Sequence, residues 1–188
     1  MTLFSPDYPS GFQYRADFIS ASDEAGLVAS IGSVTFVDFE LRGVIARRRV
    51  AFFGESYDRS AAASIPAFLL PLRAAVADWA QVEPDAFAMV LINEYRPGSP
   101  IGWHRDAPQY GIVAGVSLLA PCRMKFRPYV RPSAQSPGSS RRRATHEFRL
   151  EPRSVYVMRD KARMDYEHHI PPVAALRYSI TFRTLRSR

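Results

Sequence analysis

Two residues with metal-binding side chains, His104 and Asp106, are separated by one arginine. Alternate side chains of an extended segment point to the same face, so this imidazole and this carboxylate can bind one metal ion. The chain has four histidines, and two of them, His168 and His169, lie much further along. A second histidine from such a distant strand would complete a triad of two imidazoles and one carboxylate, the ligand set of non-haem Fe(II) centres that activate oxygen. Adjacent residues face opposite ways, so only one of His168 and His169 can join it.

The segment RYSITFR, residues 177–183, adds a second chemical feature. As a β-strand it has an apolar face of Tyr178, Ile180 and Phe182, and a polar face made of Arg177, Ser179, Thr181 and Arg183. A buried guanidinium needs an anionic partner, because an unpaired buried charge is strongly destabilising. The segment contains no acidic residue. A dicarboxylate co-substrate bound to the iron would supply an anion for each arginine, and the small hydroxyl residues between them leave room for it.

These residues belong to a longer ordered set. The chain contains Asn93-x-Tyr95-x-Pro97-Gly98, then five residues, His104-x-Asp106, the later His168, and Arg177 followed by Arg183 after five residues. This set resembles the AlkB family of 2-oxoglutarate- and Fe(II)-dependent dioxygenases, and the likeness covers about residues 87 to 185.

The resemblance implies that iron is held by His104, Asp106 and His168. The family has a histidine followed two residues later by isoleucine, which matches His168 and Ile170 and favours His168 over His169.

The resemblance also assigns residues to the co-substrate. Arg177, with Asn93 and Tyr95, is expected to hold the distal carboxylate of 2-oxoglutarate, and Arg183 the carboxylate next to the keto group. The implied fold is α+β and mainly β, with a double-stranded β-helix (jelly roll) core and N-terminal supporting helices.

The expected function is oxidative dealkylation of N-alkylated bases in DNA or RNA, of the repair type, with release of an aldehyde, succinate and CO2. The expected cofactors are Fe(II), 2-oxoglutarate as co-substrate and O2. Family members place a substrate lid before the catalytic core, which here falls on residues 47–57. We expect Arg49 to contact phosphate and Phe53 or Tyr57 to stack on a base. Alternation makes it equally acceptable that Phe53 is a core residue.

The chain departs from the base-repairing members at two places. These members often carry Asn where this chain has Ser179, and they tend to have an acidic residue soon after the H-x-D motif, where residues 107–110 are Ala-Pro-Gln-Tyr. Two further hypotheses therefore stay open. One is the same oxygenase chemistry on a protein or small-molecule substrate, and the other is a basic nucleic-acid-binding protein without catalysis.

Composition favours a globular protein with a polyanionic partner. The net charge is +7, but residues 1–40 carry one Arg against six acidic residues, so the excess of positive charge lies in the rest of the chain. Arg141 to Arg143, in a Pro- and Ser-rich segment, are a further candidate contact to phosphate. The single cysteine, Cys122, excludes an internal disulfide and favours a reducing compartment. We expect a cytoplasmic monomer without a signal peptide or membrane span.

Helices are expected first and strands later, in one domain over residues 1–188. Ser20 and Asp23 predict the start of a helix that ends near Gly32, and residues 35–53 form a hairpin-like stretch. Pro66 predicts a second helix to about residue 80, kinked or split at Pro71. The domain is expected to comprise helices and a substrate-lid region over about 1–85, and a jelly-roll core over about 86–185, where short apolar runs recur between turns.

Overall fold

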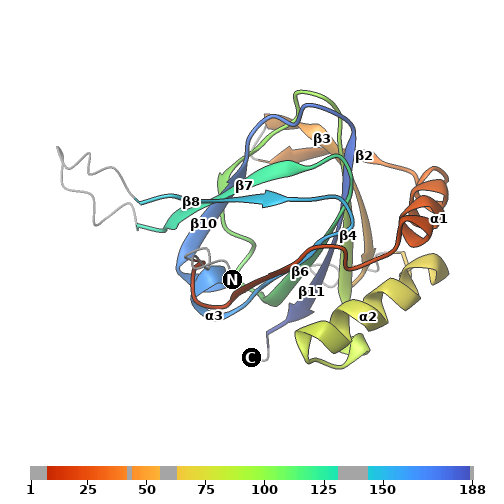
Figure 1. The fold of residues 1–188 in the computed structure, drawn as a ribbon, viewed down its shortest axis with the longest axis horizontal. Helices are drawn as coiled ribbons and strands as arrows, with labels where there is room; N and C mark the ends of the chain where they lie inside the picture. The colour runs from red at the N-terminus through yellow and green to blue at the C-terminus, as the bar shows by residue number, and fades with distance from the viewer. Residues whose placement is uncertain (1–7, 42–43, 56–62, 131–143, 187–188) are drawn as a thin grey trace, which may run out of the picture.

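A computed structural model describes residues 8–41, 44–55, 63–130 and 144–186. Its strands form two antiparallel sheets that pack face to face (Figure 1). The larger sheet has the order β1 (Phe12–Arg15), β9 (Val155–Met158), β6 (Tyr110–Leu119), β11 (Arg177–Leu185), β4 (Met89–Tyr95), β3 (Val44–Gly54) and β2 (Val37–Leu41). The smaller sheet has the order β5 (Ile101–His104), β10 (Tyr166–Ile170), β7 (Cys122–Pro128) and β8 (His146–Leu150).

Two helices cover the outer face of the larger sheet (Figure 1). Helix α1 (Ala21–Ile31) begins at a capping box, in which the Ser20 hydroxyl accepts from the Asp23 backbone N–H and the Asp23 carboxylate accepts from the Ser20 backbone N–H. The second helical segment is split as its prolines predict, into a short 3-10 turn, η1 (Ala67–Leu69), and helix α2 (Leu70–Ala80). Pro71 lies in the first turn of α2, where its missing N–H removes no intrahelical hydrogen bond.

The two largest apolar clusters of the described residues lie on opposite faces of the larger sheet. One lies between the helices and the larger sheet, where Val76 of α2, Ile92 of β4 and Phe182 of β11 are fully buried. The other lies between the two sheets and includes Met124 and Phe126 of β7. Two short elements complete the chain, η2 (Pro84–Ala86) before β4 and α3 (Asp160–Met164) before β10.

The predicted jelly-roll architecture is confirmed, but the larger sheet also uses the N-terminal half of the chain. Strands β1, β2 and β3 all precede residue 86 and extend this sheet at both edges. The described part of the stretch expected to form the substrate lid is therefore part of the larger sheet, where Arg49 to Gly54 of β3 pair with β4. No helix among the described residues is long and apolar enough to cross a membrane.

Candidate active site

The three expected iron ligands come together at one end of the smaller sheet. His104 ends β5, and its direct antiparallel partner on β10 is His168, so the two imidazole rings have centroids 4.2 Å apart. Asp106 follows β5 by two residues, and its Oδ2 lies 3.7 Å from His168 Nε2. Arg105, between the two ligands, is turned away onto the ring of Tyr129.

Hydrogen bonds fix which nitrogens are free. The Nδ1–H of His104 donates to the carbonyl of Gly102 at 2.9 Å, which leaves Nε2 with its lone pair for a metal. His169 faces the other side of β10, where its Nδ1–H donates to the carbonyl of Ile101 at 2.5 Å and its ring packs on Trp103. The structure therefore brings His168, and not His169, next to His104.

The protonation states of the three side chains suit a divalent cation. Burial lowers the pKa of His168 to about 3, with a smaller contribution from His104, and burial also lowers the pKa of His104. Burial alone would raise the pKa of Asp106, but the positive charge of Arg183 outweighs it and holds the pKa well below its usual value. Two neutral imidazoles and one ionised carboxylate at neutral pH are the forms that ligate metals.

As the side chains stand, no group of three or more His, Cys, Asp or Glu residues in the described ranges has the geometry of a finished metal site. The imidazole rings of His104 and His168 lie against each other instead. The donors nevertheless fit Fe(II), because Asp106 Oδ2 is buried without a hydrogen-bond partner and the set of two imidazoles and one carboxylate is the facial triad.

Arg183 of β11 orients the candidate carboxylate ligand. Its Nε and Nη2 donate to Oδ1 of Asp106 at 3.2 and 3.0 Å, and its Nη1 donates to the hydroxyl of Thr181 at 3.0 Å. Both hydrogen bonds to Asp106 go to the same oxygen, so Oδ2 stays available for iron. This ion pair joins the larger sheet to the segment that follows β5.

Arg177, at the other end of the same face of β11, is 1% exposed. Its Nε donates to the Ser117 hydroxyl at 3.0 Å, its guanidinium lies 4.9 Å from the centre of the Tyr95 ring, and its Nη1 is buried without a hydrogen-bond partner. An unpaired donor on a buried cation is costly until an anion arrives. The alternation predicted for residues 177–183 is thus observed, with Ile180 and Phe182 in the core next to the helices.

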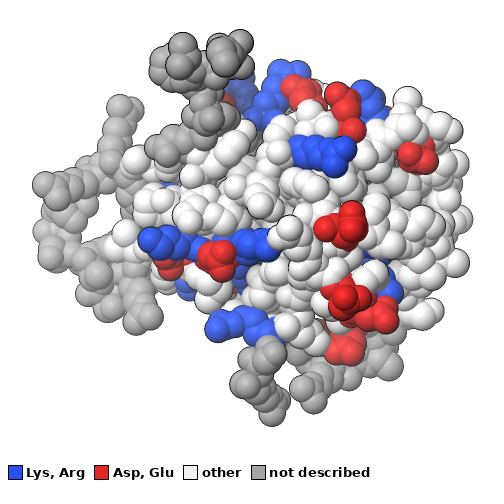
Figure 2. All heavy atoms as spheres, turned by 60° about the horizontal axis from the view of Figure 1, so that its bottom comes forward, with Lys and Arg blue, Asp and Glu red and all other residues white. Residues whose placement is uncertain are grey.

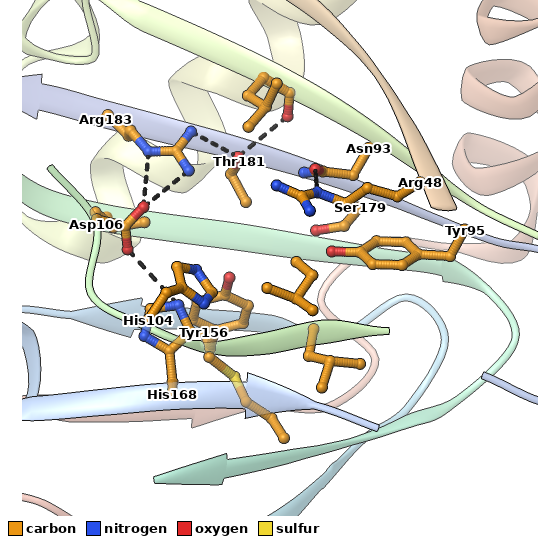
Figure 3. A pocket seen from close by; sticks show the side chains of 15 residues that line it. Arg48, Asn93, Tyr95, His104, Asp106, Tyr156, His168, Ser179, Thr181 and Arg183 are labelled. Carbon is orange, nitrogen blue, oxygen red and sulfur yellow. Dashed lines mark hydrogen bonds and ion pairs between the residues drawn. The ribbon is translucent and has the colours of Figure 1, made fainter. Parts of the chain in front are cut away.

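A pocket separates the two sets of residues (Figure 3). The larger sheet contributes Asn93, Tyr95, Ser179, Thr181 and Arg183 to its lining, and the other side contributes His104, Asp106 and His168. Arg177 is not part of the lining, although Tyr95, on which it packs, is. The candidate metal ligands and the candidate co-substrate residues of the larger sheet therefore face each other across the space between the sheets.

Arg48 of β3 is a pocket residue that the sequence-based assignment missed. It lines the pocket, and its Nε donates to the Asn93 side-chain oxygen at 3.2 Å (Figure 3). Burial lowers its pKa. The sequence signal was present, since Arg47 to Arg49 is a basic run, but choosing among three consecutive residues requires the register of β3 on β4.

That register places two of the expected substrate contacts on the far side of the sheet. Arg49 pairs with Glu94 through a 2.5 Å ion pair and also lies against the ring of Phe36, and Phe53 packs against the helix-side core. Phe52 is 40% exposed and faces the pocket side of the sheet, because its partner on β4, Leu91, lines the pocket. The assignment of Phe53 and Arg49 to substrate therefore conflicts with the geometry. Tyr57 and Arg141 to Arg143 lie outside the described residues.

Comparison with known proteins shows which family the sequence matches. A model of the 2OG-Fe(II) oxygenase superfamily matches residues 48–183. The chain is 27% identical over 169 residues to the uncharacterized protein L905 of Acanthamoeba polyphaga mimivirus, which covers 87% of this chain and 74% of that protein.

Solved structures share the fold at low sequence identity. OsALKBH1 superposes with a TM-score of 0.67 at 15% identity over 94% of this chain and 97% of that chain. A Pseudomonas putida prolyl-4-hydroxylase superposes with a TM-score of 0.63 at 12% identity, over 94% of this chain and 93% of that one. An oxidoreductase of the 2OG-Fe(II) oxygenase family from Burkholderia pseudomallei gives 0.65 at 17% identity, over 95% and 86%. The family match spans well over half of the sequence and includes every pocket residue from Arg48 to Arg183, and the chain belongs to the 2OG-Fe(II) oxygenase superfamily.

Proposed function

We propose that this oxygenase acts as an AlkB-type enzyme, which oxidatively removes alkyl groups from the nitrogens of bases in DNA or RNA. The observation that carries the proposal is that six AlkB-like motif residues, spread over 91 positions of the chain, line one pocket, namely Asn93, Tyr95, His104, Asp106, His168 and Arg183. Arg177, the remaining charged residue of the motif, packs on Tyr95. The structural likeness to OsALKBH1 also supports an AlkB-type function.

The superfamily uses Fe(II), 2-oxoglutarate and O2. When bound, these supply the oxidising power that hydroxylates an alkyl carbon on nitrogen, after which the product separates into the free base and an aldehyde, with succinate and CO2 as co-products. In this chain His104, Asp106 and His168 would hold the iron. Arg183 keeps Oδ1 of Asp106 engaged so that Oδ2 points to the metal.

The co-substrate is oriented by the cationic face of β11. Thr181 ties Arg183 to the sheet, because its hydroxyl accepts from Arg183 Nη1 and donates to the carbonyl of Leu91. Ser179 and Thr181 are small, so a dicarboxylate can lie along the strand between Arg183 and Arg177. The buried Nη1 of Arg177 then gains an anion.

The substrate side of the site is apolar and aromatic. Phe52 of β3 and Phe39 of β2 have ring centroids 6.5 Å apart on the pocket side of the larger sheet, and Phe52 is exposed. Such a surface can stack on an unpaired base.

Figure 2 shows no continuous basic patch on the face it draws, where basic and acidic side chains both occur. On β7, basic residues pair with acidic ones, as Lys125 does with Glu147. The positive net charge is therefore expected to attract nucleic acid without defining its path.

A second candidate function is hydroxylation of a protein side chain. It is favoured by the Pseudomonas putida prolyl-4-hydroxylase, whose TM-score of 0.63 is close to the 0.67 of OsALKBH1.

Succinate and formaldehyde formation tests these proposals together. The iron-loaded protein is incubated with 2-oxoglutarate and a panel of N-methylated single-stranded DNA and RNA oligonucleotides, with unmethylated oligonucleotides and proline-containing peptides alongside. Equal amounts of succinate and formaldehyde that depend on the methylated base support dealkylation. Succinate that depends on peptide, without formaldehyde, supports the second function. Oligonucleotide binding without any turnover, unchanged in His104→Ala, supports a binding protein without catalysis.

A further inference from the structure

Arg48 has an environment that differs from those of the arginines on the protein surface. It lines the pocket, it is half-buried, and it belongs to β3 rather than to the strand that carries Arg177 and Arg183. Its guanidinium lies 4.4 Å from the centre of the Phe39 ring, and its Nε donates to Asn93. These two contacts hold the side chain against the larger sheet and direct it into the pocket (Figure 3).

The sheet register relates Arg48 to Arg177. Arg49 is paired with Glu94, so Arg48 lies across from Tyr95 one position further along, and Tyr95 in turn is the direct partner of Arg177. Arg48 and Arg177 therefore flank Tyr95 in one row across three strands. In the next row toward the metal ligands, Asn93 is paired with Ser179. Arg48 donates to Asn93, so its guanidinium extends from the row of Tyr95 toward the row of Asn93, inside the pocket.

The charges around the pocket are not balanced by the described residues. Arg48 and Arg183 line the pocket, and Arg177 lies behind Tyr95, which lines it too. Asp106 is hydrogen-bonded to Arg183. Neither Arg48 nor Arg177 forms an ion pair with a carboxylate in the part of the chain that the structure describes, whereas the neighbouring Arg49 pairs with Glu94 on the other sheet face. Buried cations of this kind require an anion from a ligand.

We propose that Arg48 is a third guanidinium of the co-substrate site and binds the distal carboxylate of 2-oxoglutarate together with Arg177, one from each side of Tyr95. This inference rests on the proposed oxygenase function. Asn93 then has a positioning role, because its side-chain oxygen accepts from Arg48 Nε and leaves both terminal nitrogens free for a carboxylate. A keto acid without the distal carboxylate gains nothing from Arg48.

Calorimetric titration of the Mn(II)-loaded full chain tests the assignment without turnover. The probes are N-oxalylglycine, an unreactive analogue with both carboxylates, and oxalate, which lacks the distal group. Arg48→Gln is expected to weaken N-oxalylglycine binding about 10- to 100-fold, since a hydrogen bond between charged groups is lost, and to change oxalate binding less than about twofold. Arg48→Lys is expected to fall between, because an ammonium keeps the charge but lacks the planar fork with which a guanidinium binds a carboxylate through two parallel hydrogen bonds. Arg49→Gln, on the other sheet face, is the matched control.

The outcomes separate the two proposals. If the unchanged chain binds neither probe in the presence of Mn(II), the oxygenase function fails and this inference fails with it. If the unchanged chain binds N-oxalylglycine but Arg48→Gln and Arg48→Lys, folded by circular dichroism, bind it equally well, Arg48 does not hold the distal carboxylate. An equal loss for oxalate, or a loss confined to oligonucleotide binding, also overturns the assignment, the latter in favour of a contact to substrate phosphate.

Discussion

The two faces of the larger sheet are made by the same strands but have opposite character. Toward the helices β4, β6 and β11 present Ile92, Val116 and Phe182, all fully buried in an apolar core. Toward the smaller sheet the next residues along these strands are Asn93, Ser117 and Arg183, which are also buried. Burial is therefore nearly equal on the two faces, but on the second face it encloses donors and cations. The comparison separates a face that stabilises the fold from one that is kept polar for a ligand.

The largest effect is expected in the pocket that the polar face of the larger sheet borders. His168→Gln removes one imidazole of the candidate triad, so metal affinity should fall more than ~100-fold and succinate formation should become undetectable. His169→Gln, one residue away on the outer side of β10, should leave both nearly unchanged. Mn(II) binding measured by electron paramagnetic resonance provides the test. If the two variants lose metal equally, the ligand assignment is wrong.

Next in size is an effect on the helix side. Phe182→Ala empties a fully buried position that packs on Phe87, and should lower the free energy of unfolding by about 3–5 kcal/mol. Urea unfolding monitored by circular dichroism gives this value. The folded fraction should still bind N-oxalylglycine with the affinity of the unchanged chain, and a selective loss of that affinity would contradict the division between the faces.

Arg177→Met should show the reverse pattern. The substitution removes a buried cation with an unpartnered nitrogen, so the stability of the apo protein should stay equal or rise, while affinity for 2-oxoglutarate falls about 10- to 100-fold. Thermal unfolding with and without 2-oxoglutarate and Mn(II) measures both quantities. Marked destabilisation of the apo form would indicate that Arg177 is mainly structural.

The smallest effect is expected at Phe52, an exposed aromatic residue on the pocket side of the larger sheet. Phe52→Ala should weaken binding of a methylated single-stranded oligonucleotide by about 1 kcal/mol or more, as expected for loss of a stacking partner, with little change in stability because Phe52 is 40% exposed. Phe53→Ala should instead destabilise the fold, since it packs in the helix-side core. Fluorescence anisotropy measures the affinity for the oligonucleotide, and urea unfolding measures the stability. If Phe53→Ala weakens binding and Phe52→Ala destabilises the fold, Phe53 is the stacking residue.

The sequence predicted the site best where the argument depended on one strand alone. Alternation within residues 177–183 was enough to separate Arg177 and Arg183 from Ile180 and Phe182, because side chains of a strand have a period of two. The capping box at Ser20 was equally local. The meeting of His104 with His168 came from the family resemblance, since no local pattern specifies which distant strands become neighbours.

The prediction failed where register decides the outcome. Arg48 and Arg49 are both basic and Phe52 and Phe53 are identical in type, so which member of each pair faces the pocket depends on how β3 pairs with β4. A shift by one residue exchanges the two faces. Strand β1 was also missed, because a four-residue edge strand near the N-terminus takes its structure from pairing with β9.

The proposed iron ligands and the proposed keto-acid-binding residues belong to opposite layers of the sandwich, so under this proposal the distance between the layers affects catalysis. That distance is set by apolar side chains such as Phe126, whose ring centroid is 5.8 Å from that of His168. Trimming or enlarging such a residue shifts one half of the reaction centre relative to the other without touching any polar group. Searches for variants with altered turnover should therefore include the apolar residues between the two sheets, which scans restricted to polar residues leave out.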